Sequence, residues 1–295
     1  MKAFPTDLGS QNNDTHEQNS PFIVQKRAMT NQYHFENQIA IITGAGNGIG
    51  RATAIMMAET GAHVFAGDLH HLEENRETFT RLGITEVECD VRQEAQVQAL
   101  IERAVNQYGR IDILVNNAGI GLVKQIHQVT EAEWDACIDT NLKGTFLGCK
   151  HAIQYMLATG GGAIVNTASN AGLLPRAHDP VYSISKHAVV ALTESLGLCH
   201  GKDNIRINCV CPGPVGETGM MNDDIARAAD PEGLTQSMIR ASPIAAANRR
   251  MIRPQEVASA ICYLASKDAL MVTGTALRID GGKSLGVPPQ GISPF

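Results

Sequence analysis

The sequence predicts an α/β fold: a doubly wound parallel sheet of about seven strands with helices on both faces. Two observations support this prediction. Short, wholly apolar runs alternate with helical segments from residue 39 to residue 279. Strands that are apolar throughout are buried on both faces, as in parallel sheets whose crossovers are helices. The composition does not change along this stretch, which favours one domain over two.

The expected elements begin with the apolar run at residues 39–43, which predicts a buried strand, followed by a helix that Gly61 ends. Strands are expected at residues 39–43, 63–67, 86–89, 111–115, 162–167, 206–210 and 276–279. Helices are expected at residues 48–60, 72–82, 94–107, 131–158, 181–199 and 254–265. These segments predict repeated β-α units of one sheet.

Two stretches depart from this alternation. Residues 1–35 are rich in Gln and Asn and have little periodicity, so we expect a flexible N-terminal extension without a fold of its own. Residues 214–253 contain several Gly and Pro residues and no clear pattern, so we expect an irregular insertion or lid. A single domain would then occupy residues 36–295.

Composition excludes several classes of protein. The 295 residues include 24 basic and 30 acidic ones, a net charge of −6 without a long Lys/Arg run, which argues against nucleic-acid and anionic-membrane partners. No apolar run approaches the roughly 18 residues of a membrane span, and no signal-peptide core follows Met1. The seven Cys residues are scattered without a CxxC pair, so we expect no metal site and a reducing, cytoplasmic location.

A glycine-rich turn, Thr43-Gly-Ala-Gly-Asn-Gly-Ile-Gly50, follows the first strand and opens the first helix. Glycine lets the backbone approach a pyrophosphate, whose charge the N–H groups of the helix start then hold. Asp68 ends the second strand, where a carboxylate accepts hydrogen bonds from both hydroxyls of an adenosine ribose and repels a 2′-phosphate. Neither the turn nor Leu69 supplies a cation, although Arg51 follows directly, so NAD is expected rather than NADP.

Further motifs, in the same order along the chain, resemble those of the short-chain dehydrogenase/reductase family. The resemblance covers roughly residues 36–283. Besides the turn, its motifs are Asp90-Val91, Asn116-Asn-Ala-Gly119, Asn141, Ser169, Tyr182-Ser-Ile-Ser-Lys186, Pro212-Gly213 and Asp280-Gly-Gly282. The resemblance implies a Rossmann-type fold and an NAD(P)-dependent oxidoreductase.

The motif Tyr-x-x-x-Lys occurs twice, at residues 182–186 and 263–267. The first copy has Ser169 thirteen residues upstream, which is the spacing of the family, whereas the second has Arg250 at that offset. We therefore expect the second copy to serve structure or surface rather than catalysis.

The chemistry expected of the first copy follows from helical spacing, which places Tyr182 and Lys186 on one helix face. A free Tyr has a pKa of about 10, and a nearby ammonium is expected to lower it. Tyr182 would then take the proton of a substrate hydroxyl while hydride leaves for the nicotinamide. The resemblance implies that Lys186 also holds the nicotinamide ribose, that Ser169 orients the substrate oxygen, and that Asn141 holds a water linking Lys186 to solvent.

The resemblance also implies the remaining contacts with the cofactor. Asp90 and Val91 would flank the adenine, and residues 117–119 would line the adenosine side. Pro212, Gly213, Val215 and Thr218 would reach the carboxamide, but one extra residue precedes Thr218 relative to the family pattern, which leaves its role open. The full set of residues expected to bind NAD is Gly44, Asn47, Gly48, Ile49, Gly50, Asp68, Leu69, Asp90, Val91, Asn117, Ala118, Gly119, Tyr182, Lys186, Pro212, Gly213, Val215 and Thr218.

The expected function is hydride transfer between NAD and a secondary alcohol or ketone. A ring or sugar alcohol, a hydroxysteroid and a 3-oxoacyl thioester all remain open, and the mostly apolar lid favours a small cyclic or apolar substrate. The loop at residues 170–179 and the lid are expected to decide substrate identity.

Two alternatives stay open: an NADPH-dependent 3-oxoacyl thioester reductase, which Asp68 disfavours, and a regulatory dinucleotide-binding protein without turnover. In the latter the Ser, Tyr and Lys set would be lost, and here it is intact. As in relatives, we expect a homotetramer or homodimer through the helices at 131–158 and 181–199.

Overall fold

A computed structural model describes residues 33–70 and 72–286 of the chain. It contains a seven-stranded parallel sheet in the order β3-β2-β1-β4-β5-β6-β7, which confirms the predicted fold. The strands are β1 Ile39–Thr43, β2 His63–Asp68, β3 Thr85–Glu88, β4 Ile113–Asn116, β5 Gly162–Thr167, β6 Ile205–Pro212 and β7 Ala276–Ile279.

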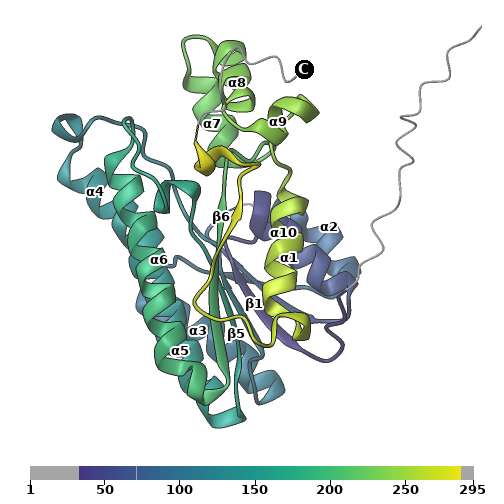
Figure 1. Cartoon of the computed structure of the whole chain (residues 1–295). Helices are drawn as coiled ribbons and strands as arrows, with labels where there is room; N and C mark the ends of the chain where they lie inside the picture. Colours follow the sequence, from purple (N-terminus) through teal and green to yellow (C-terminus); the bar gives the residue numbers. More distant parts are fainter. Residues whose placement is uncertain (1–32, 71, 287–295) are drawn as a thin grey trace, which may run out of the picture. The chain divides into compact units, whose positions relative to one another are not determined.

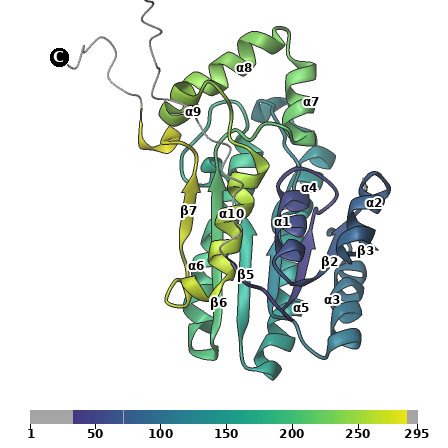
Figure 2. The same cartoon turned by 90° about the vertical axis from the view of Figure 1, so that its right-hand side faces the viewer.

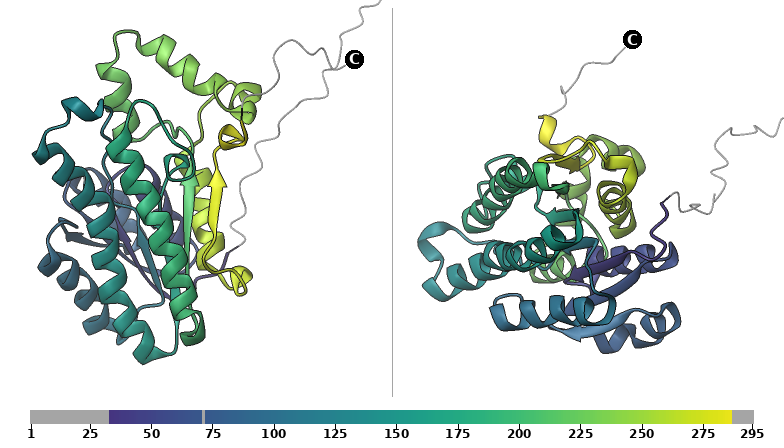
Figure 3. Two further views of the ribbon diagram at one scale, coloured as in Figure 1. Left: turned by 60° about the vertical axis from the view of Figure 1, so that its left-hand side comes forward. Right: turned by 90° about the horizontal axis from the view of Figure 1, so that it is seen from below.

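Helices cover both faces of this sheet (Figures 1 and 3). One face carries α1 (Gly48–Glu59), α2 (Leu72–Leu82) and α10 (Pro254–Ala265), and the other carries α3 (Glu94–Tyr108), α5 (Gly144–Thr159) and α6 (Pro180–His200). Because β1, β4 and β5 lie between the two helical layers, they are buried along nearly their whole length. Apolar side chains on both faces of these strands form the two largest core clusters.

The strand order reverses between β1 and β4, which are neighbours in the sheet although two β-α units separate them in sequence. In open α/β sheets such a reversal opens a crevice at the carboxyl ends of the strands, where ligands bind. The glycine turn at residues 43–50, the segment 117–119 after β4, and Ser169 after β5 all follow strands at this edge. The fold therefore gathers the predicted site there.

The segment predicted to be irregular is largely helical. It forms α7 (Gly219–Arg227), α8 (Pro231–Arg240) and α9 (Pro243–Asn248), above the carboxyl edge of the sheet in Figure 2. Pro231 and Pro243 suggested breaks, but both occupy the first helical turn, where proline needs no N–H acceptor. The side chain of Asp230 caps α8 by accepting a hydrogen bond from the N–H of Gly233 at 2.9 Å.

The two ends of this helical segment are joined by backbone hydrogen bonds. Val215 and Ile252 form an isolated parallel bridge, in which the N–H of Gly216 donates to the carbonyl of Ile252 at 2.9 Å. The N–H of Ile252 donates in turn to the carbonyl of Pro214 at 3.3 Å. The two ends of the segment are thus held side by side although 36 residues lie between Val215 and Ile252.

The helix expected at residues 131–158 is interrupted. It consists of α4 (Glu131–Ile138), a π-helical turn (Asp139–Lys143) and α5. π-turns of this kind often mark functional sites, and this one contains Asn141. Within the described residues, no helix combines the length and apolarity that crossing a membrane requires.

The predicted extension at residues 1–35 lies outside the described residues as far as residue 32. Phe35, at its end, is fully buried in the core beside α1, and its N–H donates to the carbonyl of Thr60 at 2.8 Å. The packed part of the chain therefore begins no later than this residue.

Candidate active site

Ser169, Tyr182 and Lys186 are brought together where β5 ends and α6 begins. Asp179 occupies the N-cap position of α6 and Pro180 its first turn, which places Tyr182 in the first turn and Lys186 one turn further. The Lys186 ammonium lies 5.8 Å from the centre of the Tyr182 ring. The hydroxyl of Ser169 accepts the N–H of Ala171 at 3.1 Å, which fixes it at the turn after β5 and within hydrogen-bonding reach of Tyr182.

Lys186 is almost completely buried, with 3% of its surface exposed. Its ammonium donates to the carbonyl of Thr167, the last residue of β5, at 2.8 Å. Burial lowers the pKa of Lys186 to about 8, against the opposing effect of nearby thiols, chiefly that of Cys137. The side chain is therefore fixed in place and holds its proton less tightly than an ordinary lysine.

Tyr182 differs from the expectation. Burial raises its pKa above the ordinary value, and a hydrogen bond from Ser169 and the charge of Arg176 oppose that rise. Lys186 was expected to lower this pKa, but desolvation of the phenolate outweighs the favourable contacts.

Asn141 clamps the loop after β4 to α6. Its side-chain oxygen accepts the N–H of Ile120 at 2.8 Å, and its amide donates to the carbonyl of Ile120 and to the hydroxyl of Ser185, both at 3.0 Å. A Cβ atom added to Gly119 would lie 3.1 Å from the Asn141 oxygen and 3.3 Å from the Lys186 nitrogen. Asn141 thus lies next to Lys186, and its role in holding a water remains a prediction.

The glycine turn leaves the start of α1 open. Asn47 occupies the N-cap position, but its side chain does not cap the helix; instead its oxygen accepts the N–H of Gly219 at 2.9 Å. The N–H groups of the first turn of α1 are therefore available for an anion. Glycine is required in this turn, because a Cβ at Gly50 would lie 2.0 Å from the carbonyl oxygen of Gly44.

Asp68 lies beside the turn, as expected. One carboxylate oxygen accepts the N–H of Gly46 at 2.7 Å and the other accepts the N–H of His70 at 2.9 Å. Each oxygen keeps a further lone pair, which a ribose hydroxyl can use. A carboxylate fixed next to an open helix start matches a ribose joined to a pyrophosphate, so these residues fit a dinucleotide.

The segment after β4 supports the turn from the other side. The side-chain amide of Asn117 donates to the carbonyls of Thr43 at 3.2 Å and Gly44 at 3.0 Å. The hydroxyl of Thr43 accepts the N–H groups of Asn117 at 3.1 Å and Ala118 at 3.3 Å. Asn117 and Ala118 therefore bind the ends of β1 and β4 together, and a direct contact with the cofactor remains a prediction.

The two residues expected to flank the adenine, Asp90 and Val91, lie in different surroundings. Val91 is buried against Gly144, where a Cβ would lie 2.8 Å from a Val91 methyl group. Asp90 pairs with Arg92, whose guanidinium donates to it at 2.7 and 2.9 Å. This hydrogen bond holds the pKa of Asp90 below its usual value.

The extra residue before Thr218 is absorbed by Glu217, which adopts the left-handed conformation at φ 57°. Thr218 then caps α7 by accepting the N–H of Met221 at 3.2 Å. Its methyl group lies against the glycine turn, where a Cβ at Gly48 would meet it at 2.9 Å. Thr218 therefore reaches the start of α1 despite the insertion. Val215 is buried two residues after Gly213, where the chain leaves β6 for α7.

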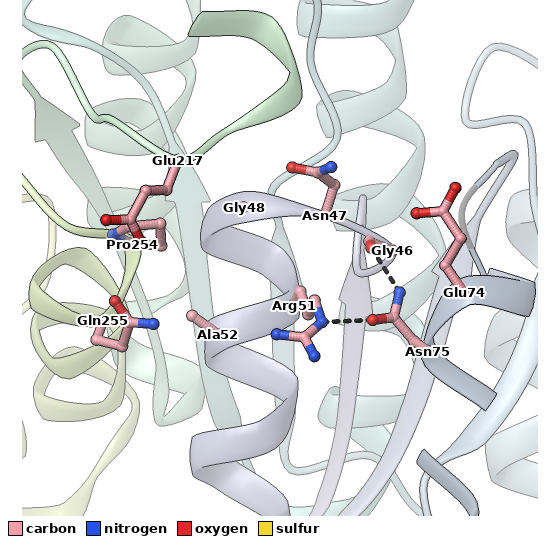
Figure 4. A pocket seen from close by; sticks show the side chains of 10 residues that line it. All are labelled: Gly46, Asn47, Gly48, Arg51, Ala52, Glu74, Asn75, Glu217, Pro254 and Gln255. Atoms are coloured by element: carbon pink, nitrogen blue, oxygen red, sulfur yellow. Dashed lines mark hydrogen bonds between the residues drawn. The ribbon is translucent and has the colours of Figure 1, made fainter. Parts of the chain in front are cut away.

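Sequence reasoning missed Asn75, a residue of α2 that binds the backbone of the glycine turn at residues 43–50. Asn75 of α2 donates to the carbonyl of Gly46 at 2.6 Å and accepts a hydrogen bond from Arg51 (Figure 4). These side chains border a pocket of about 280 Å³ between the starts of α1, α2 and α10, which Glu217 also lines. A single Asn in a helix gives no sequence signal, because its partner lies 29 residues away.

Comparison with known proteins agrees with this geometry. A family model described as short chain dehydrogenase matches residues 38–228. An uncharacterized oxidoreductase of Thermotoga maritima is 37% identical over 85% of this chain and 99% of its own length. The cis-4-hydroxycyclohexanecarboxylate dehydrogenase of Sinomonas cyclohexanicum is 38% identical over 84% of this chain and 97% of its own. The crystal structure of levodione reductase superimposes with a TM-score of 0.81 at 33% identity, covering 86% of this chain and all of that one.

Proposed function

Because the chain belongs to the short-chain dehydrogenase/reductase family of oxidoreductases, we propose that it transfers hydride between NAD and a secondary alcohol or ketone. The observation that carries this proposal is the convergence of Ser169, Tyr182 and buried Lys186 at the carboxyl edge of the sheet. A dinucleotide-binding protein without turnover would have no use for a buried lysine beside a tyrosine at this point.

In the proposed mechanism Tyr182 is the acid–base group. Its phenol oxygen takes the proton of the substrate hydroxyl, while Ser169 donates a hydrogen bond that orients the same substrate oxygen. Lys186 holds the nicotinamide ribose and lies close enough to pass a proton onward. Bound NAD, which Asp68, the glycine turn and Lys186 would hold, would supply the hydride acceptor and the positive charge of its oxidised ring. That charge favours the phenolate, whose pKa burial raises in the protein alone.

NAD is favoured over NADP because Asp68 lies beside the turn and would repel a 2′-phosphate. Arg51, the cation nearest the turn, is engaged by Asn75. Titration of NADH and NADPH by fluorescence tests this assignment. Wild-type protein should bind NADH more tightly, and Asp68→Ala should weaken NADH more than NADPH. Tighter binding of NADPH by the wild type would contradict it.

For the substrate we favour a hydroxyl on a small ring. Three partly exposed apolar side chains lie on segments next to the expected site residues: Ile120, which Asn141 holds after β4, Leu174 in the loop after Ser169, and Met220 of α7 beside Gly121. The relative named for cis-4-hydroxycyclohexanecarboxylate supports the same class. Helices α7–α9 would act as the lid over this substrate. Reduction of NAD in the presence of a panel of secondary alcohols, read by NADH absorbance, tests the class directly, and turnover of acyclic alcohols only would contradict it.

We also propose a homodimer or homotetramer that associates through α4, α5 and α6, acting in the cytoplasm. Phe146 and Leu157 of α5 and Ile184 and Leu198 of α6 expose between 46% and 87% of their surface. Apolar side chains in such numbers on adjacent helices are typical of an interface. Sedimentation should show an oligomer that Ile184→Asp dissociates; a wild-type monomer would contradict the association.

The proposed cytoplasmic location rests on the cysteines. The seven free thiols, six of them buried, suit a reducing location.

A further inference from the structure

Arg176 stands at the substrate end of the site. It lies in the loop between Ser169 and Tyr182, and its guanidinium is 3.0 Å from a carboxylate oxygen of Asp179. Asp179 directly precedes α6, so this ion pair lies one turn before Tyr182. The loop is held from the opposite side by Gln125, whose amide donates to the carbonyl of Ala177 at 3.2 Å.

The two members of this ion pair differ in exposure. The side chain of Asp179 is 3% exposed, whereas that of Arg176 is 40% exposed. A ligand entering the site therefore meets the guanidinium and not the carboxylate. Arg176 has five N–H donors, of which the contact from Nη2 to Asp179 uses only part, so a second carboxylate could bind to the others. Asp179 also contacts the hydroxyl of Ser183 at 3.5 Å, so it is itself anchored to α6.

A role in stability alone does not account for this arrangement. Burying a carboxylate is costly, and the attraction of a partly exposed partner is screened by water. Burial raises the pKa of Asp179, and Arg176 only partly opposes that rise. A costly charged pair beside a catalytic residue is more often retained for function than for stability.

Other charges lie near Arg176. Burial lowers the pKa of Lys283, and the charge of Arg176 lowers it further, which places a second cation nearby. Burial raises the pKa of Asp224 in α7, and the charge of Arg176 is among the charges that oppose this rise. Asp224 belongs to α7, so this acidic charge comes from the segment that we propose as a lid.

The segments around these groups also carry partly exposed apolar side chains, and the Asp224 carboxylate lies beside one of them, since a Cβ at Gly121 would be 4.0 Å from its oxygen. Ile120, Leu174 and Met220 are each 37–40% exposed. Met220 lies close to the loop after β4, since a Cβ at Gly121 would be 3.3 Å from its side chain. With Tyr182 as the hydroxyl-binding end and Arg176 as the cationic end, these side chains would form the apolar part of the site.

We propose that Arg176 is a specificity residue that selects substrates carrying a carboxylate at the end opposite the reacting hydroxyl, with a small apolar ring between them. Asp179 is the positioning residue that holds the guanidinium. This inference rests on the proposed function, because it names the substrate class of the same site.

The test separates binding from turnover. Calorimetry on the enzyme–NADH complex measures the affinity of cyclohexanecarboxylate, which has no hydroxyl to react, and of the neutral cyclohexanecarboxamide. The wild type should bind the acid at least tenfold more tightly than the amide. Arg176→Gln should abolish that preference, and Arg176→Lys should restore part of it. Arg110→Gln is the matched control, since Arg110 also pairs with an aspartate, Asp112, but at the amino end of β4.

A kinetic arm uses cis-4-hydroxycyclohexanecarboxylate and its methyl ester with NAD. The constants are compared on the pH-independent plateau of kcat, because loss of the Arg176 charge also raises the pKa of Tyr182. There Arg176→Gln should raise KM for the acid about 30-fold with kcat little changed, and change both constants for the ester less than twofold. An interaction that is equally strong in the bound substrate and in the transition state affects KM and not kcat when it is removed. A purely structural role of Arg176 would instead affect acid and ester alike. Equal effects on acid and ester, or no preference for the acid in calorimetry, would overturn the inference.

The two proposals fail in distinguishable ways. Turnover of both substrates without an acid preference would leave the oxidoreductase proposal standing and refute the role of Arg176. Acid-selective binding that depends on Arg176, with no turnover of any secondary alcohol, would support the anion subsite and refute the proposed reaction.

Discussion

The chain carries the spacing Tyr-x-x-x-Lys twice, and the two copies have different structures. The first lies within α6, a helix of 21 residues, and Lys186 is 3% exposed. In the second, α10 ends at Ala265, so Lys267 falls in the following 3₁₀ turn and is exposed. Only the first copy therefore has the two side chains one turn apart on one helix. The same spacing creates a site only where the helix continues through it and buries the lysine.

Arg206 secures the helix end of the second copy. Its guanidinium donates to four backbone carbonyls at the end of α10 and just beyond it, those of Leu264, Ala265, Ser266 and Ala269. The carbonyls of Leu264 and Ala265 lie in the last turn of α10, where helical donors run out, whereas those of Ser266 and Ala269 also accept the N–H groups of Ala269 at 3.3 Å and Val272 at 2.9 Å. The second copy thus belongs to a capped helix end, and the comparison predicts chemistry at one tyrosine and only packing at the other.

The largest expected difference is in turnover. Tyr182→Phe removes the acid–base hydroxyl and should lower kcat about 10³-fold, while NADH binding changes little. Tyr263→Phe is the matched control and should keep kcat within twofold. Steady-state rates and NADH fluorescence titration of both variants measure this. Equal kcat values for the two variants would show that the first copy is not the catalytic one.

The next difference is in the dependence of stability on pH. Because the pKa of Lys186 in the fold is about 8, against an ordinary 10.5, the unfolded chain keeps this proton at pH values where the folded one has lost it. The free energy of unfolding should therefore rise between pH 8 and pH 10.5, by about 3 kcal/mol for this group. Lys186→Met should lack that rise. Urea unfolding of both proteins at pH 7 and pH 10 measures it, and an unchanged difference between them would contradict it.

A smaller effect is expected at the cap of α10. Arg206→Met removes the donors of the Leu264 and Ala265 carbonyls and should lower the free energy of unfolding by about 2 kcal/mol. Because Arg206 lies at the amino end of β6, opposite the catalytic edge, kcat per folded molecule should not change. Arg278→Met, on exposed β7, is the control and should change stability by less than about 0.5 kcal/mol. A loss of kcat in Arg206→Met would link the second copy to catalysis.

The smallest effect is expected at Lys267. It is exposed beyond the helix, so Lys267→Met should change the free energy of unfolding by less than about 0.5 kcal/mol and leave kcat/KM within twofold. Chemical denaturation and initial rates at one substrate concentration below KM are sufficient. A large loss in either measurement would remove the distinction between the two lysines.

The strands and most helices could be predicted because their signals are local: apolar runs, glycine ends and helical spacing. Ser169, Tyr182 and Lys186 could be chosen because a second residue at a fixed offset separated the two copies of the motif. The helices α7–α9 were missed, since Pro231 and Pro243 indicate a break when nothing shows that they begin helices. Asn75 and Arg176 were missed because their importance depends on contacts made only in the folded chain.

The raised pKa of Tyr182 was missed for a related reason. Helical spacing shows that Lys186 is near, but it does not show that both groups are removed from water. Desolvation depends on the packing around α6, which no short motif encodes.

The segment α7–α9, which we propose as a lid, can change in length and sequence independently of the sheet. The lid is bounded by two non-glycine residues in the left-handed conformation, Glu217 at φ 57° and Arg249 at φ 53°. Just outside them the bridge between Val215 and Ile252 keeps the two junctions adjacent. A segment whose ends are fixed together can be lengthened, shortened or exchanged as one block without altering the register of the sheet. The extra residue before Thr218 is an insertion of this kind. It is accommodated by the backbone at Glu217 and leaves the preceding strand β6 unchanged. Grafting residues 217–249 of this chain into a relative should therefore transfer α7–α9 as one block, together with the substrate preference that we propose for them.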